Sequence, residues 1–127
     1  MNSAESSMLS IQVENLSDLA IIECTGRIAR SESVFKLRDV VRAQTAASVI
    51  ALDLSAVQAI SGGGLEMLAF LDRWARDHDI QFKLFSPSRS VVDGLLRSRL
   101  MPDLEIATLH EMMDILAQAD SRYDLAA

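Results

Sequence analysis

The chain has 127 residues, half of them hydrophobic and 24% charged, which fits one compact domain and leaves too little chain for a second. Eighteen acidic and twelve basic side chains give a formal net charge of −6, so the overall field disfavours nucleic acids and anionic lipids as partners. One cysteine and two histidines are too few for an internal disulfide or an ordinary structural zinc site, so we expect a cytoplasmic protein without a metal or cofactor.

The two ends of the chain frame a single domain at residues 11–119. Residues 1–10 lack the apolar core of a signal peptide, so we expect a short loose tail there and a second tail at 120–127. Charged residues such as Asp53 and Asp72 interrupt the apolar runs well before the roughly 18 to 20 residues needed to cross a bilayer. The domain is therefore expected to be soluble.

The first half of the domain alternates between strand and helix patterns. Apolar and polar residues alternate over 11–14, and a second apolar run at 19–25 ends at Gly26, which predicts a β-hairpin. Apolar residues recur at helical spacing over 31–46. The run 49–54 is nearly all apolar, as a strand covered on both faces requires, so it is predicted to be the central strand.

The second half continues this alternation. The predicted segments are the connecting residues 55–60, the glycine run 61–64, a helix at about 64–78, a strand at 81–85, a helix at 88–97, an edge strand at 104–107 after Pro102, and a helix at 109–119. Strands joined through helices of this length favour right-handed crossovers. The predicted fold class is α/β, with a mixed sheet of four to five strands and about four helices.

The run Ser61-Gly62-Gly63-Gly64 lies between a predicted strand and a predicted helix, where backbone N–H groups can hold an anion. A P-loop requires Gly-Lys-Ser/Thr at its end, whereas this chain has Gly64-Leu65-Glu66, and the dinucleotide fingerprint would need a glycine at Met67. The two lysines, Lys36 and Lys83, lie elsewhere in the pattern. Nucleotide binding stays an alternative, but glycines that permit unusual φ values or a close backbone approach explain the run at least as well.

The chain lacks the spacing of the common catalytic motifs. Ser61 has Ala59 rather than glycine two positions before it, so the Gly-x-Ser-x-Gly elbow is absent. His78 lies in a charged helix end, and aspartate at position 114 breaks the zinc-protease pattern that His110-Glu111 begins. We therefore predict no catalytic residue, no metal ligands and no enzyme activity.

Two residues stand out within the predicted strands. Asp53 is expected to accept backbone N–H bonds from the turn that follows it, because an unpartnered buried carboxylate is costly. Cys24 is expected to be a small buried hydrophobic residue rather than a reactive thiol.

The helix predicted at about 64–78 carries more apolar surface than one core face needs, an arc of roughly 160° against the usual 100° or more. One stripe contains Leu68, Leu71 and Ala75, an adjoining stripe contains Met67, Phe70 and Trp74, and the polar side contains Glu66, Asp72, Arg73, Arg76 and Asp77. Either this helix is buried deeply between the sheet and a neighbouring helix, or the second stripe belongs to a protein-docking surface, where aromatic residues and methionine are enriched.

The order of elements and the residues within them resemble the STAS domain, the fold of bacterial anti-sigma factor antagonists and of the cytoplasmic tails of sulfate transporters. The resemblance covers about 11–116 and implies a STAS-type fold. Its most specific residues are the stretch 49–55, Val57, Ile60, Gly64, Leu65 and Leu68, the stretch 82–87, and Val92, Leu95, Leu96 and Leu100.

In the antagonists of this family the loop before the second helix typically reads Asp-Ser-Ser-Gly, and a partner kinase that is also the anti-sigma factor phosphorylates the first serine. The added negative charge at a tight interface releases the partner. By this resemblance Ser61 stands at the aspartate position and Gly62 at the acceptor position, so the usual phospho-acceptor is missing. Ser61, at the helix entrance where a phosphate is favoured, is then the candidate phosphorylation residue.

A second difference follows the second strand, where the antagonists commonly read Gly-Glu-Leu-Asp and this chain reads Gly26-Arg27-Ile28-Ala29. The resembling loop helps to contact the kinase in the family. Replacing two carboxylates by Arg27 and Ala29 should therefore change partner choice through charge complementarity.

The resemblance implies a non-enzymatic module of transcription regulation that docks a kinase-type anti-sigma factor and lacks the usual serine switch. The alternative is a STAS accessory subunit of a lipid-transport ABC system, which would bind the transporter ATPase. The predicted partner-binding residues are Arg27, Ser61, Gly62, Gly63, Gly64, Glu66, Met67 and Phe70.

Overall fold

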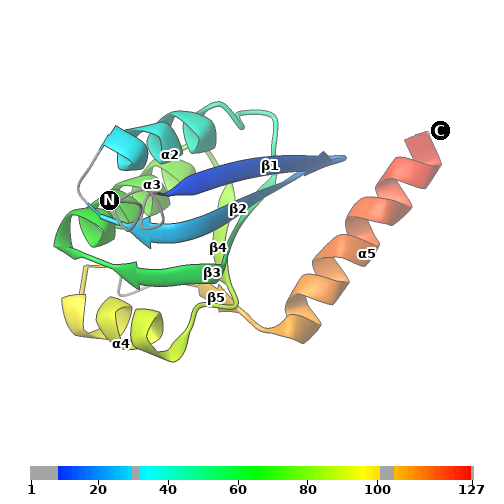
Figure 1. The fold of residues 1–127 in the computed structure, drawn as a ribbon. Coiled ribbons are helices and arrows are strands. Elements are labelled where there is room, and N and C mark those ends of the chain that lie inside the picture. Colours follow the sequence, from blue (N-terminus) through cyan, green and yellow to red (C-terminus); the bar gives the residue numbers. More distant parts are fainter. Residues whose placement is uncertain (1–8, 30–31, 101–104, 127) are drawn as a thin grey trace.

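The computed structural model describes residues 9–29, 32–100 and 105–126 (Figure 1). Its strands and helices are, in chain order, β1 (Ser10–Leu16), β2 (Leu19–Ile28), α2 (Glu32–Arg42), β3 (Val49–Ile60), α3 (Gly62–Asp77), β4 (Gln81–Phe85), α4 (Arg89–Ser98), β5 (Glu105–Ala107) and α5 (Leu109–Ala126). Most of the expected tail 1–10 and the start of the expected strand at 104–107 lie outside the described residues.

The five strands form one mixed sheet in the order β1-β2-β3-β4-β5. The β1–β2 pair is antiparallel and joined by a two-residue turn, whereas β2, β3, β4 and β5 run parallel to one another. The predicted α/β class, the hairpin and the central position of β3 are confirmed. Helices connect the parallel strands because such strands need a long crossover between them.

Strands β2 and β3 both extend beyond their predicted ends. Gly26 was expected to end the second strand, but with a φ of 108° it lies inside β2, which continues to Ile28. Residues 55–60 were expected to connect, but they belong to β3. The parallel pairing of Arg27 with Ala59 and of Ile28 with Ile60 holds both segments in the sheet.

The β2–β3 register shifts twice, because β3 contains extra residues opposite β2. Asp53 pairs with Glu23, and the next pair toward the end of the strands joins Ala56 to Thr25. The backbone N–H of Ser55, in this first irregularity, donates to Oδ1 of Asp53 at 2.9 Å. Asp53 therefore accepts the expected local bond, although within a bulged strand rather than a turn.

The two faces of the sheet contribute to two separate hydrophobic clusters. The larger cluster combines sheet residues such as Ile22, Leu52 and Leu84 with helix residues from α2, α3 and α4, for example Leu37, Leu68 and Val91. The smaller one joins sheet residues Leu19, Ala51 and Ala107 to Met112 and Ala119 of α5. Neighbouring strand residues alternate between the two clusters, as the two-residue period of a strand requires.

Helices α2 and α5 end at residues other than those predicted, and α4 has one buried and one exposed side. Helix α2 ends at Arg42 rather than Ala46, because the chain then turns and the N–H of Ser48 bonds to the carbonyl oxygen of Asp18. Helix α4 buries Val91 and Leu95 but leaves Leu96 69% exposed, because Leu96 lies about 100° round the helix from Leu95. Helix α5 continues to Ala126, past the predicted end at residue 119.

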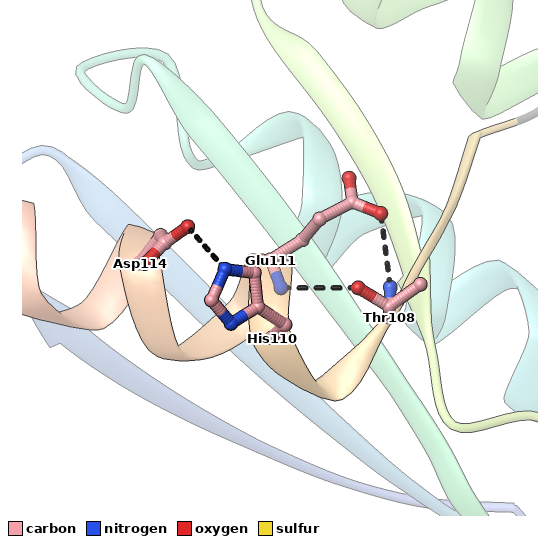
Figure 2. A network of polar contacts seen from close by, with 4 residues as sticks. All are labelled: Thr108, His110, Glu111 and Asp114. Carbon is pink, nitrogen blue, oxygen red and sulfur yellow. Dashed lines mark hydrogen bonds and ion pairs between the residues drawn. The ribbon is translucent and has the colours of Figure 1, made fainter.

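Helix α5 begins with a capping box, a pattern that the sequence expectation did not include (Figure 2). The N–H of Glu111 donates to Oγ1 of Thr108 at 3.1 Å, and the N–H of Thr108 donates to Oε1 of Glu111 at 3.3 Å. His110 points away from these groups, and its Nε2 lies 3.5 Å from Oδ2 of Asp114 on the exposed side of the helix. The Thr-x-x-Glu spacing was a readable signal for this helix start.

Candidate protein-docking site

The candidate site lies where β2 and β3 end and α3 begins. Arg27 and Ile28 end β2 beside Ala59 and Ile60 of β3, and the N–H of Ser61 donates to the carbonyl oxygen of Ile28 at 2.9 Å. Arg27 and the 61–64 run, predicted site residues on separate segments, are therefore held together at the carboxyl ends of β2 and β3. The carboxyl ends of the strands are where open α/β sheets most often carry their binding sites.

The three glycines form the first turn of α3, and the expectation of a glycine loop before the helix was wrong. The N–H of Leu65 already donates to the carbonyl oxygen of Ser61 at 2.8 Å, which closes a helical turn over the glycines. Gly64 is buried, and a Cβ there would collide with the backbone carbonyl of Ile28. Gly62 is exposed, and a Cβ there would meet no atom within 4 Å. The two glycines therefore differ: Gly64 permits close packing, and Gly62 leaves an open surface.

Ser61 is the N-cap residue of α3. Its backbone is extended, with φ −90° and ψ 176°, and its side chain makes no capping hydrogen bond. The residue is exposed. Its hydroxyl group is consequently available at the positive end of the helix dipole, where an added phosphate would be favoured.

A groove between α2 and α3 adjoins this helix start and has a volume of about 280 Å³. It is lined by Val34 and Phe35 of α2 and by Gly63, Glu66, Met67 and Phe70 of α3. The structure thus brings four predicted site residues together in one surface. Phe35 and Phe70 are 46% and 39% exposed, so two aromatic rings are accessible at the groove.

The sequence analysis did not predict that α2 contributes Phe35 to this groove. Val34, Leu37 and Val41 are buried as the helical pattern predicts, whereas Phe35 lies next to them and remains exposed. An aromatic residue outside the core stripe of an amphipathic helix was the available signal. Which helix would face it depends on the packing of α2 against α3, and helix periodicity alone does not specify that packing.

The apolar stripe Met67, Phe70 and Trp74 is divided between core and surface. Trp74 is 9% exposed and belongs to the larger cluster, Met67 is half-buried, and Phe70 is exposed. The ring of His78 lies 4.6 Å from that of Trp74, and Nδ1–H of His78 donates to the carbonyl oxygen of Trp74 at 2.8 Å. Of the two alternatives for this stripe, deep burial therefore holds for Trp74 and surface exposure for Phe70.

Asp72 corrects the predicted polar side of α3. It was placed with the solvated residues, but it is 8% exposed. Its Oδ2 accepts a hydrogen bond from Nε of Arg76 at 3.2 Å, a pair one helical turn apart. A buried carboxylate needs such partners, because an uncompensated charge in the protein interior is costly.

Basic residues lie on α2 and at the end of β2 although the whole chain is acidic. Arg27 and Lys36 are exposed and form no ion pair within 9–29, 32–100 or 105–126. The guanidinium group of Arg38 lies 5.2 Å from the centroid of the Phe35 ring, and its Nε lies 3.1 Å from Oδ1 of Asp39. Glu66 is the one carboxylate in the groove lining.

The one cysteine and the two histidines of the chain lie in different surroundings. Burial raises the pKa of the Cys24 thiol to about 12, with the negative charge of Asp53 as a smaller cause, so this thiol is protonated at neutral pH. His110 is exposed, and His78 lies at the end of α3, away from Ser61 at its start. Within the part of the chain that the structure describes, no group of three or more His, Cys, Asp or Glu side chains could hold a metal ion.

The family model of the STAS domain matches residues 10–114 of the chain. No curated protein matches it in sequence. Among solved structures, an anti-sigma factor antagonist from Mycobacterium paratuberculosis superposes with a TM-score of 0.71 at 18% identity, covering 86% of this chain and 94% of that chain. A variant of RsbS from Moorella thermoacetica gives a TM-score of 0.71 at 16% identity, covering 87% of this chain and 97% of that chain.

The murine Slc26a9 anion transporter also contains this fold, with a TM-score of 0.72 at 14% identity over 92% of this chain. Only 23% of the transporter is covered, so the likeness is confined to one part of it. None of the helices among the described residues of the present chain is long and apolar enough to span a membrane. At these identities the solved structures establish the fold.

Proposed function

The chain belongs to the STAS domain family, and on this premise we propose that it is a non-enzymatic regulatory module that docks another protein through the α2/α3 groove and the start of α3. The observation that carries the proposal is the groove itself. Two exposed phenylalanine rings and the half-buried Met67 line it beside an open helix start. Accessible aromatic residues next to polar groups are typical of the anchoring part of a protein interface.

The proposed partner is a kinase-type anti-sigma factor, in the cytoplasm. The likeness in fold to anti-sigma factor antagonists over most of both chains supports this class of partner. Arg27 and Lys36 favour a partner surface that carries carboxylates near the groove, because complementary charges accelerate encounter and penalise other partners. Arg27 stands where antagonists of the family commonly have glutamate, so the partner is expected to differ in charge from theirs.

Regulation is proposed to differ from the serine switch of the family. Gly62 has no hydroxyl group to accept phosphate, so a kinase and ATP should leave the family's usual acceptor position unmodified. Ser61, exposed and without a capping bond, is the candidate acceptor in its place. Intact mass before and after incubation with the purified partner and ATP tests this: one added phosphate that is absent in Ser61→Ala assigns the site, and an unchanged mass excludes phosphorylation by that partner.

The docking surface is tested by affinity capture from lysate of the source cell with three baits. Gly62→Arg places a long side chain into open space at the start of α3, and Gly94→Arg does the same on α4, so the two variants form a matched pair. We expect the wild-type chain and Gly94→Arg to retain a kinase-type anti-sigma factor and Gly62→Arg to lose it. Equal recovery by all three baits would remove the site assignment.

The identity of the captured protein separates the alternatives. A transporter ATPase lost only with Gly62→Arg would keep the docking surface and support the lipid-transport subunit instead. Nucleotide binding is tested by thermal shift, because a ligand at a hundredfold its Kd stabilises the protein by about 2.7 kcal/mol. We expect no shift with nucleotides.

A further inference from the structure

The two edges of the sheet are protected very differently. At one edge β5 has three residues, too few to offer a long template to another strand. At the other edge β1 has seven residues, pairs with β2 in an unbroken register, and contains no proline, lysine or arginine. Among the described residues, the outer side of β1 pairs with no other strand. Proteins usually protect such an edge with charge, proline or a bulge.

The hairpin register determines which backbone groups of β1 point outward. Leu16 and Leu19 flank the two-residue turn and therefore form a hydrogen-bonded pair, and such pairs alternate along an antiparallel ladder. Glu14 and Gln12 also bond to β2. The N–H and C=O groups of the intervening residues face away from β2. These outward residues are Ile11, Val13 and Asn15.

This outward row is complementary to itself. When two β1 strands pair antiparallel about Val13, the two Val13 residues exchange both backbone hydrogen bonds, and Ile11 faces Asn15 of the other copy. Glu14 is the only charged residue of β1, and in this register it faces Gln12 of the other copy rather than a second Glu14. The side-chain amide can donate to that carboxylate, and no like charges are opposed.

We propose that β1 is a self-association edge at which two copies of this chain pair antiparallel about Val13 and join their sheets. This use of β1 is independent of the proposed docking partner, since it requires no other molecule. The proposed partner of β1 is a second copy of this chain, because the outward hydrogen-bonding groups pair with the same groups of the other copy. In that pairing the single charged residue, Glu14, also faces Gln12 rather than another charge.

The first test is sedimentation equilibrium of the purified full chain over roughly 5 to 500 μM. We expect a concentration-dependent approach to twice the monomer mass of 13.9 kDa. Val13→Lys opposes two ammonium groups at the two-fold axis and should raise the dimer Kd at least tenfold. The matched Gln12→Lys places the same charge opposite Glu14 of the other copy and should leave the Kd unchanged or lower it.

A proline variant tests the backbone bonds separately. Val13→Pro removes an N–H that faces away from β2, so it should abolish dimerisation while the hairpin is retained, as prolines are tolerated on the free side of edge strands. A monomer mass over the whole concentration range, or a dimer that Val13→Lys leaves intact, overturns the proposal. These measurements use no partner protein, so their failure is distinct from failure of the proposed docking function.

The register is tested by single cysteines under mild oxidation. Two copies of Val13→Cys would have Cα atoms about 5.5 Å apart, within the range that a disulfide spans. Two copies of Glu14→Cys would be displaced by two residues, roughly 7 Å along the strand, and could not be bridged. We expect a covalent dimer for Val13→Cys and none for Glu14→Cys or for the wild-type chain with its buried Cys24. A covalent dimer of Glu14→Cys in place of Val13→Cys would refute this register.

Discussion

Two sides of α3 have opposite surroundings. On one side Glu66 and Phe70 are exposed at the α2/α3 groove, whereas on the other Leu71 and Ala75 are fully buried and Trp74 nearly so. One helix therefore presents a surface for docking and also supplies part of the core. The difference teaches that changes to the groove and changes to the core can be separated within a single element.

The largest difference in stability is expected between substitutions at the neighbouring residues Leu71 and Phe70. Leu71→Ala removes a fully buried side chain from the larger cluster and should lower the free energy of unfolding by about 2–5 kcal/mol. Phe70→Ala removes an accessible ring and should cost less than about 1 kcal/mol. Urea unfolding followed by circular dichroism measures both, and equal losses would contradict the division of α3 into a groove side and a core side.

Glycines two positions apart should respond in opposite directions. Gly64→Ala places a methyl group against the carbonyl of Ile28 and should destabilise the fold by about 1–3 kcal/mol. Gly62→Ala meets open space in a helical turn and should stabilise it by about 0.4–1 kcal/mol. Thermal unfolding of the two variants checks the signs. A Gly64→Ala protein as stable as the wild type would show that α3 is free to move away from β2.

The buried thiol of Cys24 in β2 should make the stability of the core depend on pH at alkaline values. Its pKa is about 12 in the folded state, against an ordinary value of 9.0 for an exposed thiol, so the unfolded chain loses this proton first as the pH rises. The contribution to stability is full below pH 9 and is lost between pH 9 and 12, at about 1.4 kcal/mol per pH unit.

Urea unfolding at several pH values between 8 and 10.5 measures this loss, with Cys24→Ala as the control. The alanine variant is destabilised by a cavity at every pH, but it lacks the thiol and should show a shallower decline. Parallel declines in the two proteins would mean that Cys24 does not keep its proton in the folded state.

The last effect is a local one, expected at the start of α5, distant in sequence from α3. Thr108→Ala removes the acceptor for the N–H of Glu111 and should cost about 1 kcal/mol. Thr108→Ser retains the hydroxyl group and is the control. Hydrogen exchange of the first turn of α5 reports the change, and unaltered protection in Thr108→Ala would argue against the capping box of Figure 2.

Local patterns predicted much of the fold. The alternating run at 11–14 and the apolar run at 49–54 correspond to β1 and the central strand, and the strand predicted at 81–85 matches β4. Their periodicity comes from burial of alternate or all side chains, which the sequence records directly. The ends of β2 and β3 were missed because Gly26 and Ser55 look like turn residues in isolation, whereas pairing between the two strands retains them in the sheet.

The candidate site was predicted in part. Residue types and helical spacing selected the run 61–64 and Phe70 as site residues, but they placed the helix start at about Gly64 and left open whether Phe70 is core or surface. They did not select Phe35, because its relation to Phe70 exists only after α2 packs beside α3. Trp74 and Phe70 belong to the same stripe of the helix, yet one is core and the other is surface.

By itself the sequence determined the α/β alternation, the central strand, the absence of common catalytic spacings and the presence of a glycine run next to a helix. Each of these depends on neighbouring residues, whose properties any local window contains. The tertiary structure alone decided that Gly64 packs against Ile28, that Asp72 is buried and that Phe35 completes the groove. These outcomes depend on contacts between segments distant in the chain, and such contacts arise only when the helices pack on the sheet.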